Sequence, residues 1–317
     1  MTTNGEGSNR QLVASWSAAT VSGCRPVAGW TIVGKARLDG GDRRNVDRLR
    51  RACEAAARLD LKIELDEADH LDRPIHLLAL AGDEVIGYAG ITTDDEAEAC
   101  GMVHPSWRRR GAGTALLEGL RAAARSLGHE SILLICEDAW PAGLAWFRRL
   151  GATHEASERR MVVRPAKRPM PGAPATPVEL RPASDADHAA VVAVLGEDYS
   201  DGPGEFRLVG VEGETVIGTV RLTETTQRTM IYGFVIDEPR RGERLGTRML
   251  GAVFDRLRTD GVREVGLEVN PDNTPAVRLY ERFGFETVTT YRYMRLAITP
   301  LEHPDQDRAP VRRGGAR

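Results

Sequence analysis

The sequence VHPSWRRRGAGTALL at residues 103–117 joins a strand-like apolar run to a helix-like run through a turn rich in arginine and glycine. A second stretch of the same kind, VIDEPRRGERLGTRML, occupies residues 235–250. In each stretch the turn presents backbone amides at the start of a helix, where the helix dipole also favours negative charge. Each stretch therefore predicts an anion site, suited to a pyrophosphate, between a strand and a helix.

The two stretches are parts of a longer tandem repeat. Gly113 is matched by Gly246, and Gly151 by Gly284, in both cases 133 residues later. Further upstream the tripeptide Val-Ile-Gly occurs twice, at an offset of 131 residues. We interpret the chain as two copies of one folding unit.

The proline-rich sequence RPAKRPMPGAPATP separates the two copies. Its prolines interrupt helix and sheet hydrogen bonding and favour an extended linker, so we expect two separable domains. The two ends of the chain lack apolar periodicity and are expected to be mobile. The predicted segments are a tail at 1–28, a first domain at 29–163, a linker at 164–177, a second domain at 178–298 and a tail at 299–317.

Apolar residues within each copy alternate between a period of two, typical of strands, and steps of three and four, typical of helices. The first copy has strand patterns at 31–38, 75–81, 85–93, 97–104, 131–136 and 158–163, and helix patterns at 42–59, 111–127 and 141–150. The second copy repeats this order, with helix patterns at 185–195, 244–259 and 274–283. The predicted fold class is α+β, with two tandem domains, each a mixed and mostly antiparallel sheet flanked by helices.

Composition excludes several classes of protein. The chain has 317 residues, a formal charge of −3 and 28% charged residues, which indicates neither nucleic-acid nor anionic-membrane binding. No apolar run is long enough for a membrane span, and the start lacks a secretory signal pattern, so we expect a cytoplasmic protein. The four cysteines stand singly, without the spacing of a zinc site or disulfide framework. No metal site is expected. Only three of the 43 basic residues are lysine, a bias typical of GC-rich bacteria.

Three kinds of phosphate loop compete for the first glycine turn. A dinucleotide-binding loop needs G-x-G-x-x-G, but Leu116 stands where its third glycine belongs. A P-loop needs G-x-x-x-x-G-K-[ST], which is absent from the sequence. What remains is the pattern R-x-x-G-x-G, formed by Arg108, Gly111 and Gly113.

With this pattern the chain resembles the GCN5-related N-acetyltransferase (GNAT) superfamily, whose coenzyme loop reads Q/R-x-x-G-x-G/A after a strand ending in V-x-P. The sequence Val103-His104-Pro105 agrees with that strand end, and NTPAVRLYERFGF at 273–285 is similar to a second motif of the family. The resemblance implies acetyl-CoA as cosubstrate, with its pyrophosphate on the two loops. The implied coenzyme-binding residues are Met102, Val103, Arg108, Arg110, Gly111, Gly113 and Thr114 in the first copy, and Phe234, Val235, Ile236, Arg241, Gly242, Arg244, Gly246, Thr247 and Asn273 in the second.

The second loop departs from the family pattern at one position. Arg244 stands where the first copy has Gly111, so a side chain occupies a place that favours glycine. The arginine either weakens coenzyme binding or adds a phosphate contact. Because Arg241, Gly246 and Thr247 are kept, we expect binding to be retained.

The second copy also carries candidate catalytic groups. Glu268 and Tyr280 lie twelve residues apart, a spacing similar to that in ribosomal-protein N-terminal acetyltransferases. The resemblance implies that Glu268 is the general base for the ammonium and Tyr280 the general acid for the departing thiolate. The alternatives are an exposed strand residue for Glu268 and a residue that packs on the sheet for Tyr280.

The first copy lacks these groups at the matching positions. Ile135 replaces the glutamate, Phe147 the tyrosine and Trp140 the asparagine, and Glu158 is the remaining substitute for a base. We therefore predict that the second copy performs the chemistry and that the first is structural, regulatory or coenzyme-binding. The tandem layout with one degenerate half is similar to that of the mycothiol synthases of actinobacteria.

Two classes of function stand at this point. The first is an acetyl-CoA-dependent N-acetyltransferase acting on a small-molecule amine or a protein N-terminus. The second is a non-catalytic protein that binds acetyl-CoA or a partner. An acidic loop at 196–206 favours a cationic acceptor but is also typical of a solvated loop. The sequence identifies neither the acceptor nor the oligomeric state.

Overall fold

The computed structural model of the chain describes residues 15–16, 29–63, 65, 75–93, 96–165, 178–197, 199, 201, 205–224 and 228–298. The first half contains, in chain order, β1 (Ser15–Trp16), β2 (Thr31–Lys35), α1 (Gly40–Ala57), β3 (Ile75–Ala81), β4 (Glu84–Thr93), β5 (Ala97–Val103), α3 (Ala112–Ser126), β6 (Ser131–Glu137), α4 (Pro141–Arg149) and β7 (Thr153–Val163). The second half contains β8 (Glu179–Pro182), α5 (His188–Leu195), β9 (Glu205–Glu212), β10 (Thr215–Glu224), β11 (Thr229–Ile236), α6 (Leu245–Thr259), β12 (Val265–Val269), α7 (Thr274–Arg282) and β13 (Glu286–Ala297). The predicted fold class is confirmed.

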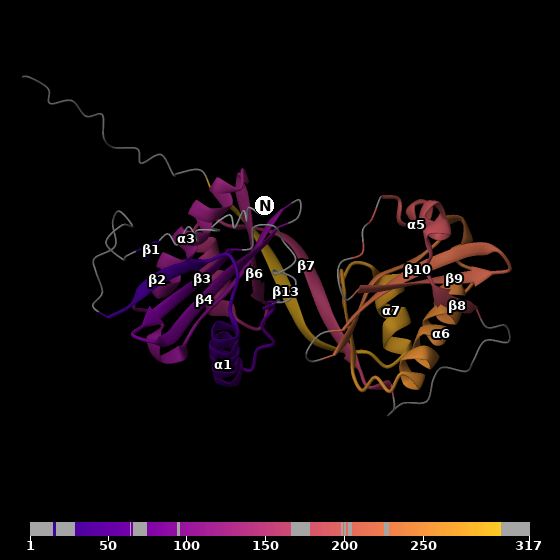
Figure 1. Cartoon of the computed structure of the whole chain (residues 1–317), viewed down its shortest axis with the longest axis horizontal. Coiled ribbons are helices and arrows are strands. Elements are labelled where there is room, and N and C mark those ends of the chain that lie inside the picture. Colours follow the sequence, from indigo (N-terminus) through magenta and orange to yellow (C-terminus); the bar gives the residue numbers. More distant parts are fainter. Residues whose placement is uncertain are drawn as a thin grey trace, which may run out of the picture.

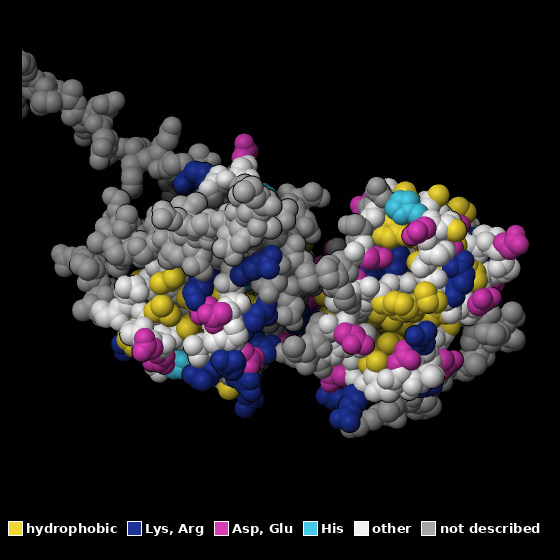
Figure 2. Space-filling view, viewed as in Figure 1, with side chains coloured by type: hydrophobic (Ala, Val, Ile, Leu, Met, Phe, Trp, Pro, Cys, Tyr) yellow, Lys and Arg dark blue, Asp and Glu magenta, His cyan; other side chains and the backbone are white. Residues whose placement is uncertain are grey.

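Helices cover both faces of the sheet in the first half. On one face, α3 buries Ala112, Leu116 and Leu120 against β3, β4 and β6. On the other face, α1 buries Val46 and Leu49 at helical spacing against the opposite sides of β3 and β4. The second half repeats this arrangement, with α6 and α7 on one face and α5 on the other. In the space-filling view, hydrophobic side chains gather over α6 and α7, so the second half presents an apolar surface there (Figure 2).

All described strands form one continuous sheet. Its order is β1-β2-β3-β4-β5-β6-β13-β7-β12-β11-β10-β9-β8, so the last strand of each half lies between strands of the other half. Strand β13 pairs with β6 and β7, and β7 pairs with β12 and β13, all antiparallel. Figure 1 shows these two long strands crossing the middle of the molecule. The two halves therefore share a pair of strands rather than merely touching.

The exchange follows an internal twofold pseudosymmetry. In the ladder between the shared strands, Tyr291 is the partner of Glu158, and these two residues are themselves 133 positions apart. At this point of the ladder, a residue therefore faces its own repeat equivalent. The pseudosymmetry axis passes between Glu158 and Tyr291, and the two arginine-glycine loops belong to the two halves that it relates.

This exchange changes the expectation of separable domains. Without β13, strand β6 loses an antiparallel partner, and without β7, strand β12 does the same. The sequence could not reveal this, because each copy contributes one strand after its last helix and the pattern does not say which half that strand joins. The N-terminal segment also differs from a plain tail, since β1 pairs with β2. Most of that segment, the linker from 166 to 177 and the C-terminal tail from 299 lie outside the described residues.

Cutting the chain between the halves is expected to leave them associated. A protease site inserted between residues 166 and 177 should give two fragments on a denaturing gel but one species by size-exclusion chromatography, because β7 and β13 stay paired. A chain ending at residue 165 should instead expose the edge of β6 and aggregate when expressed alone. Fragments that separate under native conditions would contradict the shared sheet.

In each half two parallel strands pair briefly and then separate. Strand β5 pairs with β6 only at Glu98–Leu133 and Ala99–Leu134, although both strands continue. Strand β11 pairs with β12 from Thr229 to Ile231 and likewise continues without it. The arginine-glycine loops follow the free ends of β5 and β11. None of the described helices has the length and continuous apolar sequence that crossing a bilayer requires.

Candidate active site

A cavity of about 530 Å³ opens where β5 and β6 separate in the first half. Its lining includes Arg108, Gly111 and Gly113 of the glycine loop, and Lys62 and Glu137 beside the shared strands. Of the other residues predicted to bind coenzyme in the first copy, Met102, Val103 and Thr114 also line it. Most of the remaining wall is apolar, with side chains from α3, β6 and α4, including Leu116, Leu134, Trp140, Trp146 and Phe147. A cavity with an amide-rich loop and an apolar wall suits a long ligand with a phosphate group.

The arginine that opens each loop folds back onto the end of its strand. In the first half Arg108 Nε donates to the Val103 carbonyl at 3.0 Å. In the second, Arg241 Nε donates to the Ile236 carbonyl at 3.3 Å. The Arg108 guanidinium also lies 4.9 Å from the Trp140 ring centroid. Arg110, another predicted coenzyme residue, lies over the Trp107 ring instead, at 5.1 Å.

The two loops share one backbone conformation. Arg109 and Gly111 have left-handed φ angles of 64° and 90°, and their equivalents Gly242 and Arg244 have φ angles of 92° and 61°. The first loop has its glycine at the second of these two positions, and the second loop has it at the first. The backbone turn is the same in both loops. Arg244 therefore does not alter the loop; it adopts the left-handed conformation at a cost of roughly 1–2 kcal/mol.

No side chain caps the first turn of either helix that follows these loops. Gly111 and Arg244 are the N-cap residues of α3 and α6, and neither position has a side-chain cap hydrogen bond. The first amides of both helices are therefore available to an anion. In the second half, Gly246 lies against Leu279, Ile236 and Phe234, and Thr247 Oγ1 accepts from Arg282 at 3.3 Å.

The structure gives Asn273 a local role. Asn273 Oδ1 accepts from the Ala276 amide at 3.3 Å and so caps α7. Trp140, its equivalent, precedes α4 without a side-chain cap. In the acidic loop, Asp201 pairs with Arg207 and Glu205 with Arg221, whereas Asp198 lies outside the described residues.

Tyr280 lies in the core of the second half. Its ring packs edge-on against Phe234 at 6.4 Å and Phe285 at 5.6 Å between centroids. Burial raises the pKa of Tyr280 to about 12, so its hydroxyl is protonated at neutral pH. That hydroxyl has no hydrogen-bond partner among the described residues and is available as a proton donor. Tyr280 therefore packs in the core, as one alternative expected, and its role as general acid stays a prediction.

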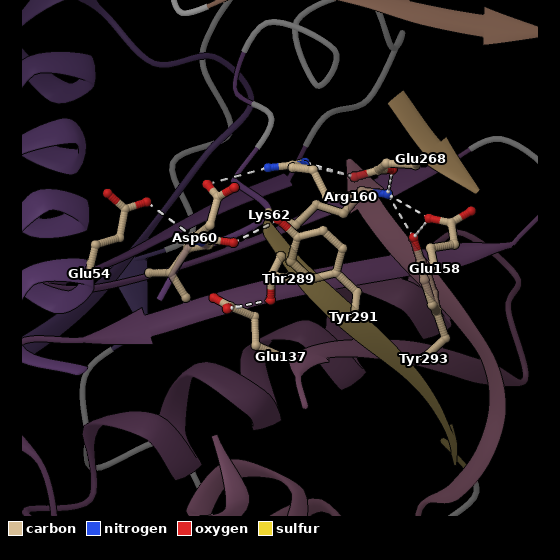
Figure 3. A network of polar contacts seen from close by, with 11 residues as sticks. Glu54, Asp60, Lys62, Glu137, Glu158, Arg160, Glu268, Thr289, Tyr291 and Tyr293 are labelled. Carbon is tan, nitrogen blue, oxygen red and sulfur yellow. Dashed lines mark hydrogen bonds and ion pairs between the residues drawn. The ribbon is translucent and has the colours of Figure 1, made fainter. Parts of the chain in front are cut away.

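Glu268 is buried in an ion-pair network between the halves (Figure 3). Its Oε2 accepts from Lys62 Nζ at 2.7 Å, and its Oε1 accepts from Arg160 at 2.8 Å. Lys62 also contacts Glu158 at 3.2 Å and donates to the Tyr293 hydroxyl at 2.6 Å. Although burial opposes the charged form, Lys62 and Arg160 lower the pKa of Glu268. A carboxylate held by two cations is a weak base in this arrangement.

Removing the Glu268 charge is expected to destabilise the fold. Glu268→Gln leaves Lys62 and Arg160 buried without this carboxylate, which should lower the free energy of unfolding by about 3–5 kcal/mol at neutral pH. The lowered pKa means that the carboxylate contributes stability above the unfolded-state pKa near 4.5 and loses it as pH falls through the folded-state value. Urea unfolding of both chains should therefore give curves that differ most at neutral pH and converge in acid. Equal stability at neutral pH would show that the network is not coupled to folding.

Glu137 is the candidate that the repeat pattern missed. It ends β6 and lines the cavity, but the offset of 133 placed Ile135, two residues earlier, opposite Glu268. Residues two apart share one face of a strand, so a search along that face was the signal that would have found it. Glu137 Oε2 accepts from the Thr289 hydroxyl at 2.7 Å. Burial raises the pKa of Glu137.

Two other side chains near the cavity have structural rather than chemical surroundings. Burial raises the pKa of the Cys136 thiol to about 12, so it is not a nucleophile at neutral pH. His104 accepts from the Ser106 amide at 3.3 Å and caps a short turn. In the described part of the chain no group of three or more His, Cys, Asp or Glu residues is arranged to hold a metal ion.

Comparison with known proteins agrees with this arrangement. The family model described as "Acetyltransferase (GNAT) family" matches residues 44–152 and 176–285, once in each half. A mycothiol acetyltransferase of Brachybacterium faecium is 30% identical over 236 residues, covering 64% of this chain and 68% of that protein. A mycothiol acetyltransferase of Sanguibacter keddieii is 28% identical over 304 residues, covering 80% of this chain and 92% of that protein.

Solved structures show the same fold. A GCN5-related N-acetyltransferase from Sphaerobacter thermophilus has a TM-score of 0.69 at 23% identity, covering 85% of this chain and 96% of that one. A tandem GNAT protein from the clavulanic acid biosynthesis pathway has a TM-score of 0.65 at 19% identity, and the match covers 86% of this chain and 99% of that one. The family model matches each half, and each half has an uncapped arginine-glycine loop and a pair of separating strands. The chain therefore belongs to the GNAT family of acetyltransferases, as a tandem member.

Proposed function

We propose that this protein transfers the acetyl group of acetyl-CoA to the primary amine of a small molecule. The cavity of the first half, which connects an uncapped glycine loop to the buried Glu137, supports acetyl-CoA as the ligand, and the protonated Tyr280 of the second half supports the transfer. Members of the family use acetyl-CoA, and two relatives at 28–30% identity are named for mycothiol, a small molecule. A protein N-terminus is the alternative acceptor class.

The residues of the cavity fit acetyl-CoA. Its pyrophosphate would accept from the amides of residues 111–114, with Arg108 beside it, and its pantetheine arm would follow the free edge of β5 at Met102 and Val103. When bound, acetyl-CoA supplies an activated acetyl thioester. The protein's part is to hold that thioester away from water and to move protons at the acceptor and at the sulfur.

In this proposal the second half performs transfer with Tyr280 as the proton donor. The protonated hydroxyl lies on α7, beside Phe234 on the free end of β11. Glu268 becomes a base only when the ammonium of the acceptor displaces Lys62 from its carboxylate. The assignment to the second half therefore depends chiefly on Tyr280.

A panel of amines tests the activity directly. Glucosamine, serine, spermidine and a peptide with a free N-terminus, each incubated with acetyl-CoA and the protein, are followed by release of free thiol and by mass of the acetylated product. We expect transfer to at least one of the small amines, and faster transfer than to the peptide. Transfer to the peptide alone would move the acceptor to the protein class, and no transfer would leave a coenzyme-binding protein.

A further inference from the structure

Two buried carboxylate oxygens of the polar network lack a hydrogen bond of ordinary geometry, and one of them belongs to Glu137 on the wall of the cavity in the first half. Glu137 is 4% exposed, and its Oε1 is buried without a hydrogen bond of ordinary geometry from any described residue, although the Asp60 backbone amide lies close enough to lower the pKa of Glu137. Asp60 Oδ2 is buried and unpartnered in the same sense. Figure 3 shows Glu137, Thr289 and Asp60 at one end of the polar network. A buried acceptor without a donor is costly, so this end of the network is built for a ligand with N–H or O–H groups.

The charges of the network also leave a place for a cation. Among the labelled residues of Figure 3 there are five carboxyl groups but two cations, Lys62 and Arg160; the carboxyl groups are those of Glu54, Asp60, Glu137, Glu158 and Glu268. Both cations are bound to Glu268, and Arg160 reaches Asp60 only at 3.6 Å. Negative charge is therefore least compensated near Asp60 and Glu137. Buried charges require compensation, which a bound cation supplies.

A primary ammonium fits these requirements better than a metal ion. It carries one positive charge and N–H donors, which suit the carboxylate of Glu137 on the cavity wall. The described residues contain no group arranged to hold a metal. Glu137 also lines the cavity that begins at the glycine loop, so an amine bound there would share one cavity with the acetyl donor.

We propose that the first half is a second acetyl-transfer centre, in which Glu137 binds the ammonium of a primary amine and accepts its proton. The inference rests on the proposed function and adds a centre to it. One ammonium proton passes to Glu137, and the freed nitrogen attacks the acetyl carbonyl carbon. The carbon–nitrogen bond forms, the carbon–sulfur bond breaks, and a second proton from nitrogen goes to the departing thiolate. The products are the acetamide and coenzyme A.

The surroundings of Glu137 suit this role. Burial raises its pKa, and the nearby Asp60 charge acts in the same direction, which makes Glu137 a stronger base than an exposed carboxylate. Three other groups lower the pKa of Glu137: the Thr289 hydroxyl and the Asp60 backbone amide through hydrogen bonds, and Arg160 through its charge. Thr289 lies on β13, so the second half of the chain positions the base of the first.

Two substitutions, each of which blocks coenzyme binding in one half, separate the two centres experimentally. Gly113 and Gly246 are the second residues of α3 and α6. Aspartate is favourable to a helix at this position but places a carboxylate among the amides that receive the pyrophosphate. Gly246→Asp therefore blocks the second half and keeps the first centre active. Gly113→Asp blocks the first half and keeps the second centre active.

The test measures acetyl transfer to the four amines of the panel by the Gly246→Asp chain, with and without Glu137→Gln. We expect the Gly246→Asp chain to transfer acetyl, and Glu137→Gln in that chain to lower kcat by roughly 10²–10⁴-fold while acetyl-CoA affinity is kept. Glu137→Asp, which retains a carboxylate, should restore part of the rate. Circular dichroism of each variant checks folding.

Each remaining outcome decides between the proposals. Transfer by the Gly113→Asp chain but none by the Gly246→Asp chain overturns the second centre and leaves the proposed function intact. Transfer by Gly246→Asp that survives Glu137→Gln overturns the role of Glu137. Absence of transfer in the unsubstituted chain overturns the proposed function, and the second centre with it.

Discussion

Replacing Tyr280 with phenylalanine in the Gly113→Asp chain should lower kcat by roughly 10²–10⁴-fold, the range expected when a general acid is lost. The first half does not bind the coenzyme in that chain, so the measured rate belongs to the second half. At neutral pH the buried hydroxyl carries its proton, because its pKa is raised to about 12. Phenylalanine removes this proton but keeps the ring that packs on Phe234 and Phe285.

The control for this experiment is another tyrosine of the second half. Tyr232 lies on β11 under the Arg221 guanidinium and is not among the residues assigned to coenzyme binding or proton transfer, so Tyr232→Phe should leave the rate unchanged. Acetyl-CoA affinity, measured separately, should be the same in both variants. A Tyr280→Phe chain with normal turnover would move the proton donor elsewhere and remove the main support for chemistry in the second half.

Gly113→Asp should weaken acetyl-CoA binding to the first half by roughly 100-fold. A carboxylate about 5 Å from a phosphate charge, at an effective dielectric constant of about 20, costs about 3 kcal/mol, and about 1.4 kcal/mol corresponds to a tenfold change. A Cβ at this position meets Trp146 and Val103 at 3.8 Å, an ordinary contact, so the substitution acts through charge. Calorimetry with acetyl-CoA measures the effect.

The matched control adds the same charge away from the loop. Gly251 lies within α6, where a Cβ would meet nothing within 4 Å, and Gly251→Asp should keep the affinity of the unsubstituted chain. Because the loop effect is electrostatic and partly exposed, it should shrink as salt is added. Unchanged binding in Gly113→Asp would place the pyrophosphate elsewhere than on α3.

Most of the fold follows from patterns that are local in the sequence. Periodic apolar residues predicted α1, α3 and α6 to within a few residues, and the glycine turns predicted the two loops. The shape of the second loop needed the structure, because Gly242 takes the left-handed position held by Arg109 while Arg244 takes that of Gly111. A residue-by-residue comparison with the motif sees only the missing glycine.

The site was harder to predict, because its charges come from distant parts of the chain. Lys62 and Glu268 are 206 residues apart in sequence, and Arg160 and Glu268 are 108 apart. These contacts exist because two strands are exchanged, and no local pattern records that exchange. The resemblance to the family implied that Glu268 is the general base, whereas in the structure Lys62 and Arg160 bind its carboxylate.

The pseudosymmetry axis between Glu158 and Tyr291 has a consequence for how the two halves diverged. The architecture is that of a strand-swapped homodimer whose two protomers are joined in one chain. In a homodimer, a residue next to the symmetry axis faces its own copy, so two glutamates or two tyrosines would meet there. Fusion removes that constraint, and an acid and a phenol now occupy equivalent places. The joined chain can therefore build, at its centre, an asymmetric polar network that a symmetric pair of identical subunits would be unable to form.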